Sequence, residues 1–168
     1  MIQRRSQNEP VAYLVKEKEF WSKIFLVSKN TLIPRPETEL MVEKLVNIHK
    51  NKSISILDIG TGSGCILISL LSELNNSKGL GIDISKHAIQ IAKKNAERHG
   101  KSLNIKFLNK SLSSTFNQKF DLIVSNPPYI RTGDIKNLNE DIKKYEPRIA
   151  LDGGNDGLDL IKKVIYKT

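Results

Sequence analysis

Cysteine is almost absent from this chain of 168 residues, in which Cys65 stands alone. Without a second cysteine, an intrachain disulfide framework is excluded and a reducing compartment is favoured. No apolar run approaches the length that spans a membrane, and the first seven residues lack the apolar core of a secretory signal. Internal repeats and low-complexity tracts are also missing. We therefore expect a soluble protein of the cytoplasm.

Histidine is scarce as well, and the three that occur are His49, His87 and His99. They fall in helical patterns, with no metal-ligand spacing among themselves or with Cys65. The sequence therefore predicts surface or helix-end histidines and no metal site.

Acidic residues are outnumbered, 18 against 27 basic ones, so the net charge is +9. Such a charge suggests nucleic-acid binding. However, the lysines are scattered through every segment and are not interleaved with aromatic residues. A generally solvated basic surface is the favoured interpretation, and a basic surface for RNA stays open as the alternative.

The length predicts about one domain, with enough chain to bury a core. Apolar strand patterns alternate with helical patterns, at a spacing that is typical of a doubly wound, mostly parallel α/β sheet. The expected strands span residues 54–59, 79–83, 104–108 and 120–125, and the expected helices span 66–74, 88–98 and 157–167.

Before this alternation, weak helical character around Val11–Leu14 precedes two short β-type runs that predict a hairpin, residues 20–21 and 24–27. Pro36 then suits the start of a helix that runs to about Lys50, with an apolar stripe of Leu40, Met41, Leu45, Val46 and Ile48. No strand follows the last expected helix. We therefore expect the sheet to lack C-terminal strands and the strand at 120–125 to form its edge.

The segment Asn126-Pro127-Pro128-Tyr129 ends the last expected strand abruptly. Two prolines cannot donate ladder hydrogen bonds, so the chain leaves the sheet in a stiff, extended turn. Ligands of open α/β sheets bind at this end of the strands. Asn126 and the Pro127 carbonyl could accept the two N–H groups of a planar amide or amine, with Tyr129 against its face. The alternative is a strand-ending loop in which Asn126 forms an Asx-turn.

A glycine-rich loop, Gly60-Thr61-Gly62-Ser63-Gly64, joins the first parallel strand to its helix. Its spacing differs from that of a dinucleotide fingerprint and resembles the S-adenosylmethionine loop of class I methyltransferases. Asp83, at the end of the next strand, could accept hydrogen bonds from ribose hydroxyls. We expect nucleotide or nucleoside binding here; the alternative for each glycine is a tight strand-to-helix turn.

The end of the third strand, Asn109-Lys110-Ser111, is the next expected part of this site. Asn109 and Ser111 are candidate contacts near an adenine ring. Lys110 stands where an acidic residue is expected, which weakens the predicted adenine pocket.

Several further segments resemble the HemK-type release-factor glutamine methyltransferase family. They are residues 33–39 (Ile-Pro-Arg-Pro-Glu-Thr-Glu), Glu19-Phe20-Trp21, Arg4-Arg5, Glu9-Pro10, Glu146-Pro147, Ala150-Leu151, Asp152-Gly153-Gly154 and Asp156-Gly157-Leu158. The resemblance runs in order from about Arg4 to the last helix.

This resemblance implies S-adenosylmethionine as cofactor and methyl transfer to the glutamine of the Gly-Gly-Gln loop in peptide chain release factors. Asn126, Pro127 and Tyr129 would be catalytic; Asn126, Pro127, Pro128 and Tyr129 would bind substrate. The cofactor contacts would be Gly60, Thr61, Gly62, Ser63, Gly64, Asp83, Asn109, Ser111 and Asn126. Nucleic acid would be met only indirectly, through the translation machinery.

Family members carry a further N-terminal helical domain and additional C-terminal strands, so the resemblance implies a chain truncated at both ends. Residues 1–35 would be the remnant of the N-terminal domain with a hairpin linker, and residues 36–168 the incomplete methyltransferase domain. Two alternatives stay open. One is a methyltransferase acting on exocyclic amines of RNA or DNA; the other is a non-catalytic remnant of the enzyme.

Overall fold

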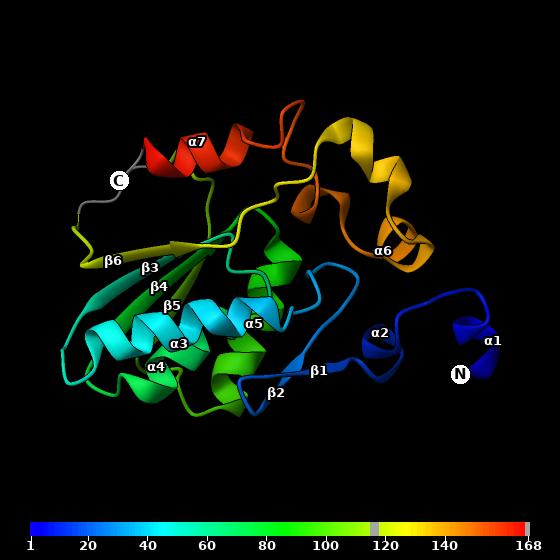
Figure 1. Cartoon of the computed structure of the whole chain (residues 1–168). Coiled ribbons are helices and arrows are strands. Elements are labelled where there is room, and N and C mark those ends of the chain that lie inside the picture. The colour runs from blue at the N-terminus through cyan, green and yellow to red at the C-terminus, as the bar shows by residue number, and fades with distance from the viewer. Residues whose placement is uncertain (115–117, 167–168) are drawn as a thin grey trace.

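A four-stranded parallel sheet forms the centre of the computed structural model, which describes residues 1–114 and 118–166 (Figure 1). Its strands are β3 (Ser55–Ile59), β4 (Lys78–Asp83), β5 (Ile105–Asn109) and β6 (Leu122–Ser125), in the spatial order β5-β4-β3-β6. The chain moves outward from β3 to β5 and then returns to the other side of β3. This reversal creates a switch point between β3 and β6, where ligands of such sheets bind.

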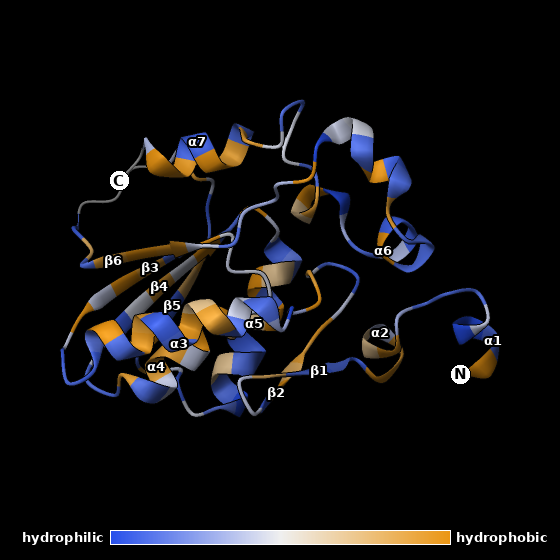
Figure 2. Ribbon diagram, in the orientation of Figure 1, coloured by the Kyte–Doolittle hydropathy of each residue, from blue (hydrophilic) through white to orange (hydrophobic). Residues whose placement is uncertain are grey.

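Helices cover both faces of the sheet. On one face lie α3 (Glu37–His49), α4 (Cys65–Glu73) and α5 (Lys86–Arg98), and on the other lies α7 (Asp159–Ile165) (Figure 1). Apolar colouring concentrates on the strands and on α4, while the exposed sides of α5 are polar (Figure 2). The prediction of a doubly wound α/β sheet is confirmed.

The predicted hairpin is present as β1 (Glu17–Phe20) and β2 (Lys23–Leu26). Trp21 and Ser22 form its turn, both with a φ of 53°. The Trp21 backbone N–H donates to Glu39 Oε1 at 2.9 Å, so α3 holds this left-handed turn in place. Two short helices, α1 (Ile2–Arg5) and α2 (Val11–Val15), precede the hairpin.

One hydrophobic cluster joins the hairpin to the sheet. Phe20 and Phe25 of the hairpin are 1% and 0% exposed and pack with buried residues of α4, α5 and the strands. A second cluster on the opposite face contains Leu57 and Ile82, against which Val164 of α7 packs. The hairpin is thus built into the same core as the parallel sheet.

The apolar stripe predicted for α3 is partly wrong. Leu40 and Ile48 are each 61% exposed, whereas Val42 is fully buried. Leu40 lies two residues before Val42, about 200° around the helix, and so points away from the sheet. Ile48 sits in the last turn of the helix. Pro36 directly precedes the helix with helical backbone angles, φ −56° and ψ −36°.

Between β6 and α7 the chain forms three short helical segments that the sequence pattern does not predict. They are η1 (Thr132–Asn137), α6 (Glu140–Tyr145) and η2 (Arg148–Ala150). Each has at most two turns, which is too short for a helical periodicity to mark it. The expected final helix is observed as α7, and its predicted last residue, Lys167, lies outside the described residues.

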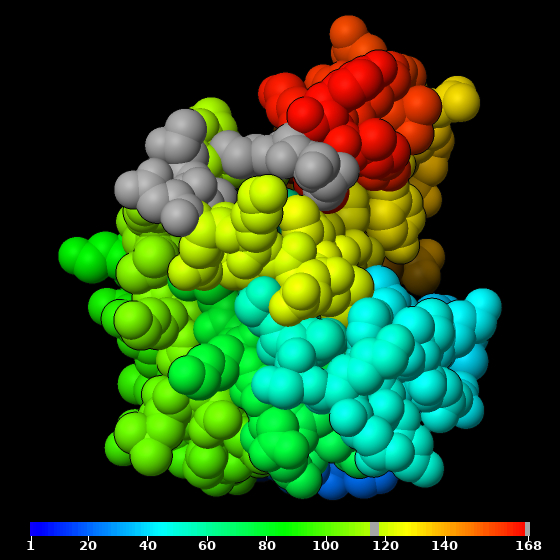
Figure 3. All heavy atoms as spheres, turned by 90° about the vertical axis from the view of Figure 1, so that its left-hand side faces the viewer, coloured from blue at the N-terminus to red at the C-terminus, as the bar shows by residue number. Residues whose placement is uncertain are grey.

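Strand β6 pairs with β3 and with no other strand among residues 1–114 and 118–166, as expected for an edge strand. The segment that contains β6, yellow in Figure 3, lies at the surface between the cyan α3 and the red α7. Within the same described ranges, no helix combines the length and apolar character that crossing a membrane requires.

Candidate active site

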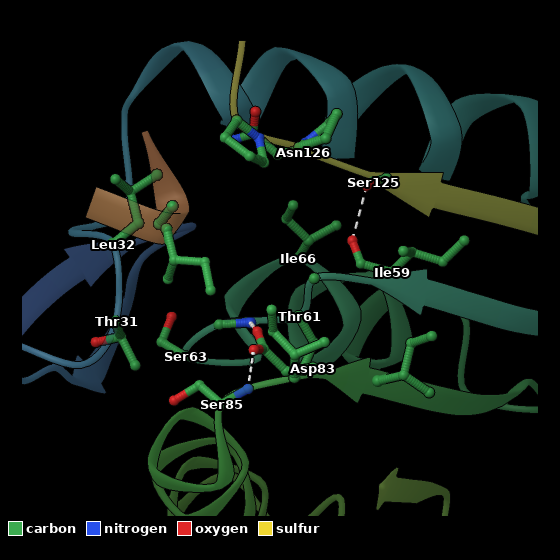
Figure 4. Close-up of a pocket in the computed structure, with 18 of the residues that line it drawn as sticks. Thr31, Leu32, Ile59, Thr61, Ser63, Ile66, Asp83, Ser85, Ser125 and Asn126 are labelled. Carbon is green, nitrogen blue, oxygen red and sulfur yellow. Dashed lines mark hydrogen bonds between the residues drawn. The ribbon is translucent and has the colours of Figure 1, made fainter. Parts of the chain in front are cut away.

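Two neighbouring cavities meet at the turn that follows β6. The first lies over the carboxyl ends of β3 and β4 and is lined by the glycine-rich loop, Asp83 and the turn (Figure 4). The second is lined by Tyr129, Ile130 and residues of α3 and α6. The residues that line both cavities are Leu32, Arg35, Thr38, Ser125, Asn126, Pro127 and Ala150. Asn126 and Pro127 therefore lie in the wall between the two cavities.

The glycine-rich loop bends through three left-handed residues, with a φ of 71° at Gly60, 55° at Gly62 and 80° at Gly64. A Cβ at Gly60 would meet no atom within 4 Å, so this part of the loop borders open space. Gly64 differs, because its Cβ would lie 3.1–3.2 Å from Ile68, Ala92 and Phe107. Gly64 thus serves helix packing, while Gly60 and Gly62 expose backbone to the first cavity.

Asp83 ends β4 and holds the rim of the first cavity together. Its Oδ2 accepts from the Gly62 N–H at 3.0 Å and its Oδ1 from the Ser85 N–H at 2.8 Å (Figure 4). Burial raises the pKa of the Asp83 carboxyl, and the hydrogen bonds from Ser85 and Gly62 oppose that rise. Each carboxylate oxygen keeps a second lone pair with which it can accept a hydroxyl from a ligand.

Asn126 presents its amide without a partner in the part of the chain that the structure describes. No side-chain hydrogen bond joins it to residues 1–114 or 118–166, so the Asx-turn alternative is not observed. The preceding Ser125 is fixed, because its Oγ donates to the Ile59 carbonyl at 2.7 Å (Figure 4). An amide on a rigid strand end can accept or donate toward either cavity.

A second carboxyl, Asp58, lies beneath the glycine-rich loop and is completely buried. Its Oδ2 accepts from Thr61 Oγ1 at 2.6 Å, and its Oδ1 has no hydrogen-bond partner among the described residues. Burial raises the pKa of Asp58 to about 7; the hydroxyl of Thr61 opposes the rise, and the charge of Asp83 adds to it. Thr61 lines the first cavity and Asp58 does not, so Asp58 reaches the cavity only through its hydrogen bond with Thr61.

Most residues predicted for the site line one or both cavities, as Gly60, Thr61, Gly62, Ser63, Asp83, Asn126, Pro127, Pro128 and Tyr129 do. Gly64, Asn109 and Ser111 line neither. The Asn109 side-chain amide donates to the carbonyls of Asp83 and Ile84, at 2.9 and 2.8 Å, and so is turned toward the backbone. Lys110 and Leu112 line the first cavity in their place.

The sequence interpretation missed the walls contributed by residues 30–38 and 147–151. These walls are joined through Glu146, whose side chain is 1% exposed. Its Oε1 accepts from Arg35 Nη2 at 2.5 Å, and its Oε2 accepts from the Ile33 N–H at 3.2 Å. Both segments carried part of the family resemblance, and this resemblance is the signal that could have marked them as parts of the site.

Among the described residues, 1–114 and 118–166, no histidine lines either cavity, so the serines and threonines there have no imidazole base beside them. Cys65 lines the first cavity, but burial raises the pKa of its thiol to about 12, so the thiol stays protonated. His49 ends α3 and His99 caps the end of α5, where its ring packs on Phe25 at 4.9 Å. His87 lies exposed in the first turn of α5. The cavities are therefore arranged for positioning rather than for covalent catalysis.

The part of the chain that forms the two cavities matches a known protein family. The family model described as "Methyltransferase small domain" matches residues 35–149, a range that includes the glycine-rich loop, Asp83 and the Asn126 turn. The chain belongs to this family. The matched range contains most of the residues that line the two cavities, and it leaves out those at 30–34 and those beyond residue 149.

Several curated relatives of this chain carry the name "Release factor glutamine methyltransferase". The relative from Geobacter sulfurreducens is 41% identical over 165 residues, which are 98% of this chain and 57% of the relative. The relative from Buchnera aphidicola subsp. Baizongia pistaciae is 46% identical over 166 residues, 98% of this chain and 59% of the relative. This chain thus spans somewhat more than half the length of these relatives.

Among solved structures, the hMettl16 catalytic domain in complex with the MAT2A 3'UTR hairpin 6 matches with a TM-score of 0.67. The alignment covers 94% of this chain and 70% of that one, at 17% identity. At this level of identity the match shows that the two chains share a fold and shows nothing finer.

Proposed function

We propose that this chain carries the catalytic site of an S-adenosylmethionine-dependent methyltransferase that acts on the side-chain amide of a glutamine in peptide chain release factors. The observation that carries the proposal is the position of Asn126 and Pro127 in the wall between two cavities. One cavity has the features of a donor site, and the other is open to an acceptor. A group transferred between them must pass the Asn126 turn.

The residues of the first cavity suit S-adenosylmethionine. Backbone at Gly60 and Gly62 borders open space, and the Asp83 carboxylate has lone pairs available for ribose hydroxyls. Apolar side chains for an adenine ring come from Ile84, Leu112 and Ile149. The donor would supply an electrophilic methyl group on a sulfonium centre. Gly64, Asn109 and Ser111 are not part of this proposed contact set, because they do not line the cavity.

The second cavity suits a primary amide. An amide nitrogen is a poor nucleophile because its lone pair is delocalised into the carbonyl group. The Asn126 side-chain oxygen and the Pro127 carbonyl would each accept one N–H of the substrate, and Tyr129, which is 63% exposed, would pack on its planar face. This hold would favour a pyramidal nitrogen whose lone pair points toward the methyl group. The nitrogen–carbon bond would form as the sulfur–carbon bond of the donor breaks, which would leave a neutral thioether, and one N–H proton would then be lost to solvent. Rate acceleration would come mainly from positioning.

The names of the curated relatives support glutamine as the acceptor and release factors as partners. The family resemblance narrows this to the glutamine of the Gly-Gly-Gln loop. We also propose that the protein acts in the cytoplasm, which agrees with its single, buried cysteine. Residues 36–168 would carry most of the donor site; the assignment of residues 1–35 as an N-terminal domain remnant and linker stays a prediction.

The decisive experiment is a transfer assay with methyl-tritiated S-adenosylmethionine and purified release factor. Label should enter the wild-type release factor and not a variant in which the Gly-Gly-Gln glutamine is replaced by glutamate. RNA and DNA of matched concentration serve as alternative acceptors in parallel reactions. Label in nucleic acid would establish the exocyclic-amine alternative, and label in no acceptor would contradict the proposed function for this chain.

A further inference from the structure

The segment Asp152–Leu158 carried part of the family resemblance, yet no residue of it is assigned a role by the proposed function. In the structure it lies directly behind the Asn126 turn. The Ile130 N–H donates to the Leu151 carbonyl at 3.0 Å, and the Gly153 N–H donates to the Ile130 carbonyl at 2.8 Å. These bonds form a parallel bridge between Ile130 and Asp152. The segment therefore continues the sheet-like pairing past the end of β6.

Two glycines of this segment are in close contact with the backbone of the turn. A Cβ on Gly153 would lie 2.7 Å from the Gly157 carbonyl oxygen of the same segment, and 2.8 Å from both the Pro128 carbonyl oxygen and Tyr129 Cα of the turn. A Cβ on Gly157, whose φ is +78°, would lie 2.5 Å from the Tyr129 carbonyl oxygen. Real Cβ contacts are essentially never this short, and backbone atoms cannot rotate away as a side chain can. A side chain at either position must therefore displace the turn or the segment behind it.

Asp152 stabilises the packing of this segment against the turn through side-chain hydrogen bonds. Its Oδ1 accepts from Thr132 Oγ1 at 2.6 Å and from the Gly154 N–H at 3.1 Å. The Thr132 N–H donates in turn to the Gly154 carbonyl at 2.9 Å. The hydrogen bond from Thr132 is the main cause that lowers the pKa of the Asp152 carboxyl. The backbone on the C-terminal side of Tyr129 is thus fixed by main-chain and side-chain bonds together.

We propose that Gly153 and Gly157 are positioning residues that hold the Pro128–Tyr129 backbone, and through it the Pro127 carbonyl and the Tyr129 ring, in the geometry for methyl transfer. This inference rests on the proposed function for the meaning of the turn, but the contacts themselves are independent of the acceptor. A turn that contains two prolines is stiff internally and can still move as a unit about its ends. Close glycine contacts at one end and the Ser125 bond at the other restrict that motion.

The chain offers a matched control for each glycine. Gly133 has an ordinary φ and nothing within 4 Å of its Cβ position, so Gly133→Ala controls for Gly153→Ala. Gly100 has a φ of +65° and likewise open space, so Gly100→Ala carries the backbone strain of Gly157→Ala without its collision. Comparing each pair separates contact with the turn from the general effect of replacing glycine.

The test measures kcat, the KM for release factor and the Kd for S-adenosylmethionine in the full 168-residue chain. Gly153→Ala and Gly157→Ala should each lower kcat at least about tenfold relative to their controls, since a misplacement near 1 Å can cost about a hundredfold. The donor Kd should stay within about threefold of the controls, because the loop and Asp83 are untouched. Equal kcat in the paired variants would overturn the proposal.

Two further measurements cover the remaining outcomes. The first applies if the alanine variants at Gly153 and Gly157 do not fold. Asp152→Ala should then lower kcat, and Asp152→Asn should have a kcat close to that of wild type, because it keeps an oxygen for Thr132 and Gly154. Equal kcat for the two Asp152 variants overturns the proposal.

The second applies if the wild-type chain methylates no acceptor, in which case the proposed function fails. Amide hydrogen exchange then decides the positioning role: exchange at Ile130 must be faster in Gly153→Ala than in Gly133→Ala, and equal rates would contradict it.

Discussion

Asn126 combines two properties that are seldom found together in a folded protein. Its side chain stands on a rigid strand end, and it makes no hydrogen bond to any described residue, 1–114 or 118–166. Partly buried amides usually find partners within their own protein. An amide left without one at the junction of two cavities is available to a substrate.

Replacement of Asn126 by alanine should abolish methyl transfer while leaving donor binding close to that of wild type. Losing a preorganised polar group at the reacting atoms costs on the order of 2–4 kcal/mol in the transition state. Single-turnover assays with release factor measure the first effect, and calorimetric titration with S-adenosylmethionine measures the second. Asn126→Asp keeps an accepting oxygen and should retain more activity than the alanine variant. Turnover of Asn126→Ala within about threefold of wild type would exclude the role.

Asp83→Ala should weaken binding of S-adenosylmethionine about tenfold or more, since hydrogen bonds to a charged group contribute about 1.5–3 kcal/mol. Part of the loss will come from the glycine-rich loop, because Asp83 accepts from the Gly62 N–H. Ser111→Ala is the matched control, as Ser111 is exposed and does not line the cavity. Calorimetry that shows equal affinities for the two variants would move the donor site elsewhere.

Asp58 makes the stability of the protein depend on pH in a direction unusual for a carboxyl group. Its pKa rises from 3.8 in the unfolded chain to about 7 in the folded one. The folded state therefore holds a proton that the unfolded state has released, and stability falls as pH rises from about 4 to about 7. At about 1.4 kcal/mol per pH unit, the loss is at most about 4 kcal/mol. The groups that face Asp58 are Thr61 Oγ1, the Asp83 carboxylate and the Cys65 thiol.

Asp58→Asn should remove this pH dependence. The variant and the wild type should have similar unfolding free energies at about pH 4, close to the pKa of Asp58 in the unfolded chain, and the variant should be the more stable of the two at about pH 8. Urea unfolding at both pH values provides the measurement. A difference that is the same at both values would show that Asp58 does not titrate in this range.

At the scale of elements, helices and strands could be predicted from the sequence where apolar residues recur with a regular period, and could not be predicted where they do not. All four parallel strands and the helices α3, α4 and α5 are predictable from apolar periodicity, because each buries one face or stripe against the sheet. The segments η1, α6 and η2 contain few buried side chains and are held by local hydrogen bonds, which leave no periodic signal.

The candidate site divides in the same way. The glycine-rich loop, Asp83 and the Asn126 turn were predictable, because strand ends of a parallel sheet meet at one edge. The positions of Asn109 and Ser111 were not, since a loop after a strand can turn either residue toward the cavity or away from it. Nor could the Arg35–Glu146 pair be read from the chain, because 111 residues separate the partners.

This pair should couple the two walls that it joins. We expect a double-mutant cycle with Arg35→Met and Glu146→Gln to give an interaction free energy of at least about 1 kcal/mol, as contacting, partly buried groups do. The exposed pair Lys162–Asp156 is the matched control, and we expect no resolvable coupling there. Urea unfolding of the four members of each cycle provides the measurement. Additive effects at Arg35 and Glu146 would show that the walls are positioned independently.

At the scale of the whole molecule, the hairpin and the parallel sheet share one core, and the chain supplies a probe for each. Trp21, the only tryptophan, lies in the hairpin turn, whereas far-ultraviolet circular dichroism reports mainly the sheet and helices. Because Phe20 and Phe25 pack in the main cluster, both signals should change together in a single transition.

Phe25→Ala should therefore destabilise the entire described fold, by about 3–5 kcal/mol for a large core side chain replaced by alanine. Tryptophan fluorescence and circular dichroism should shift to lower urea concentration by the same amount. Loss of the fluorescence transition alone, with the circular dichroism transition unchanged, would show that residues 1–35 form a separate unit.

The alignment of β6 with β3 also determines which changes in chain length the protein can tolerate. Only four residue pairs, Ile56–Leu122 to Ile59–Ser125, define this alignment. Deleting one residue from β6 would shift the remaining strand and the Asn126 turn by about 3.3 Å and reverse which face each side chain occupies. Asn126 would then move away from the glycine-rich loop by more than the length of a hydrogen bond. Selection should therefore act against insertions and deletions within β3 and β6.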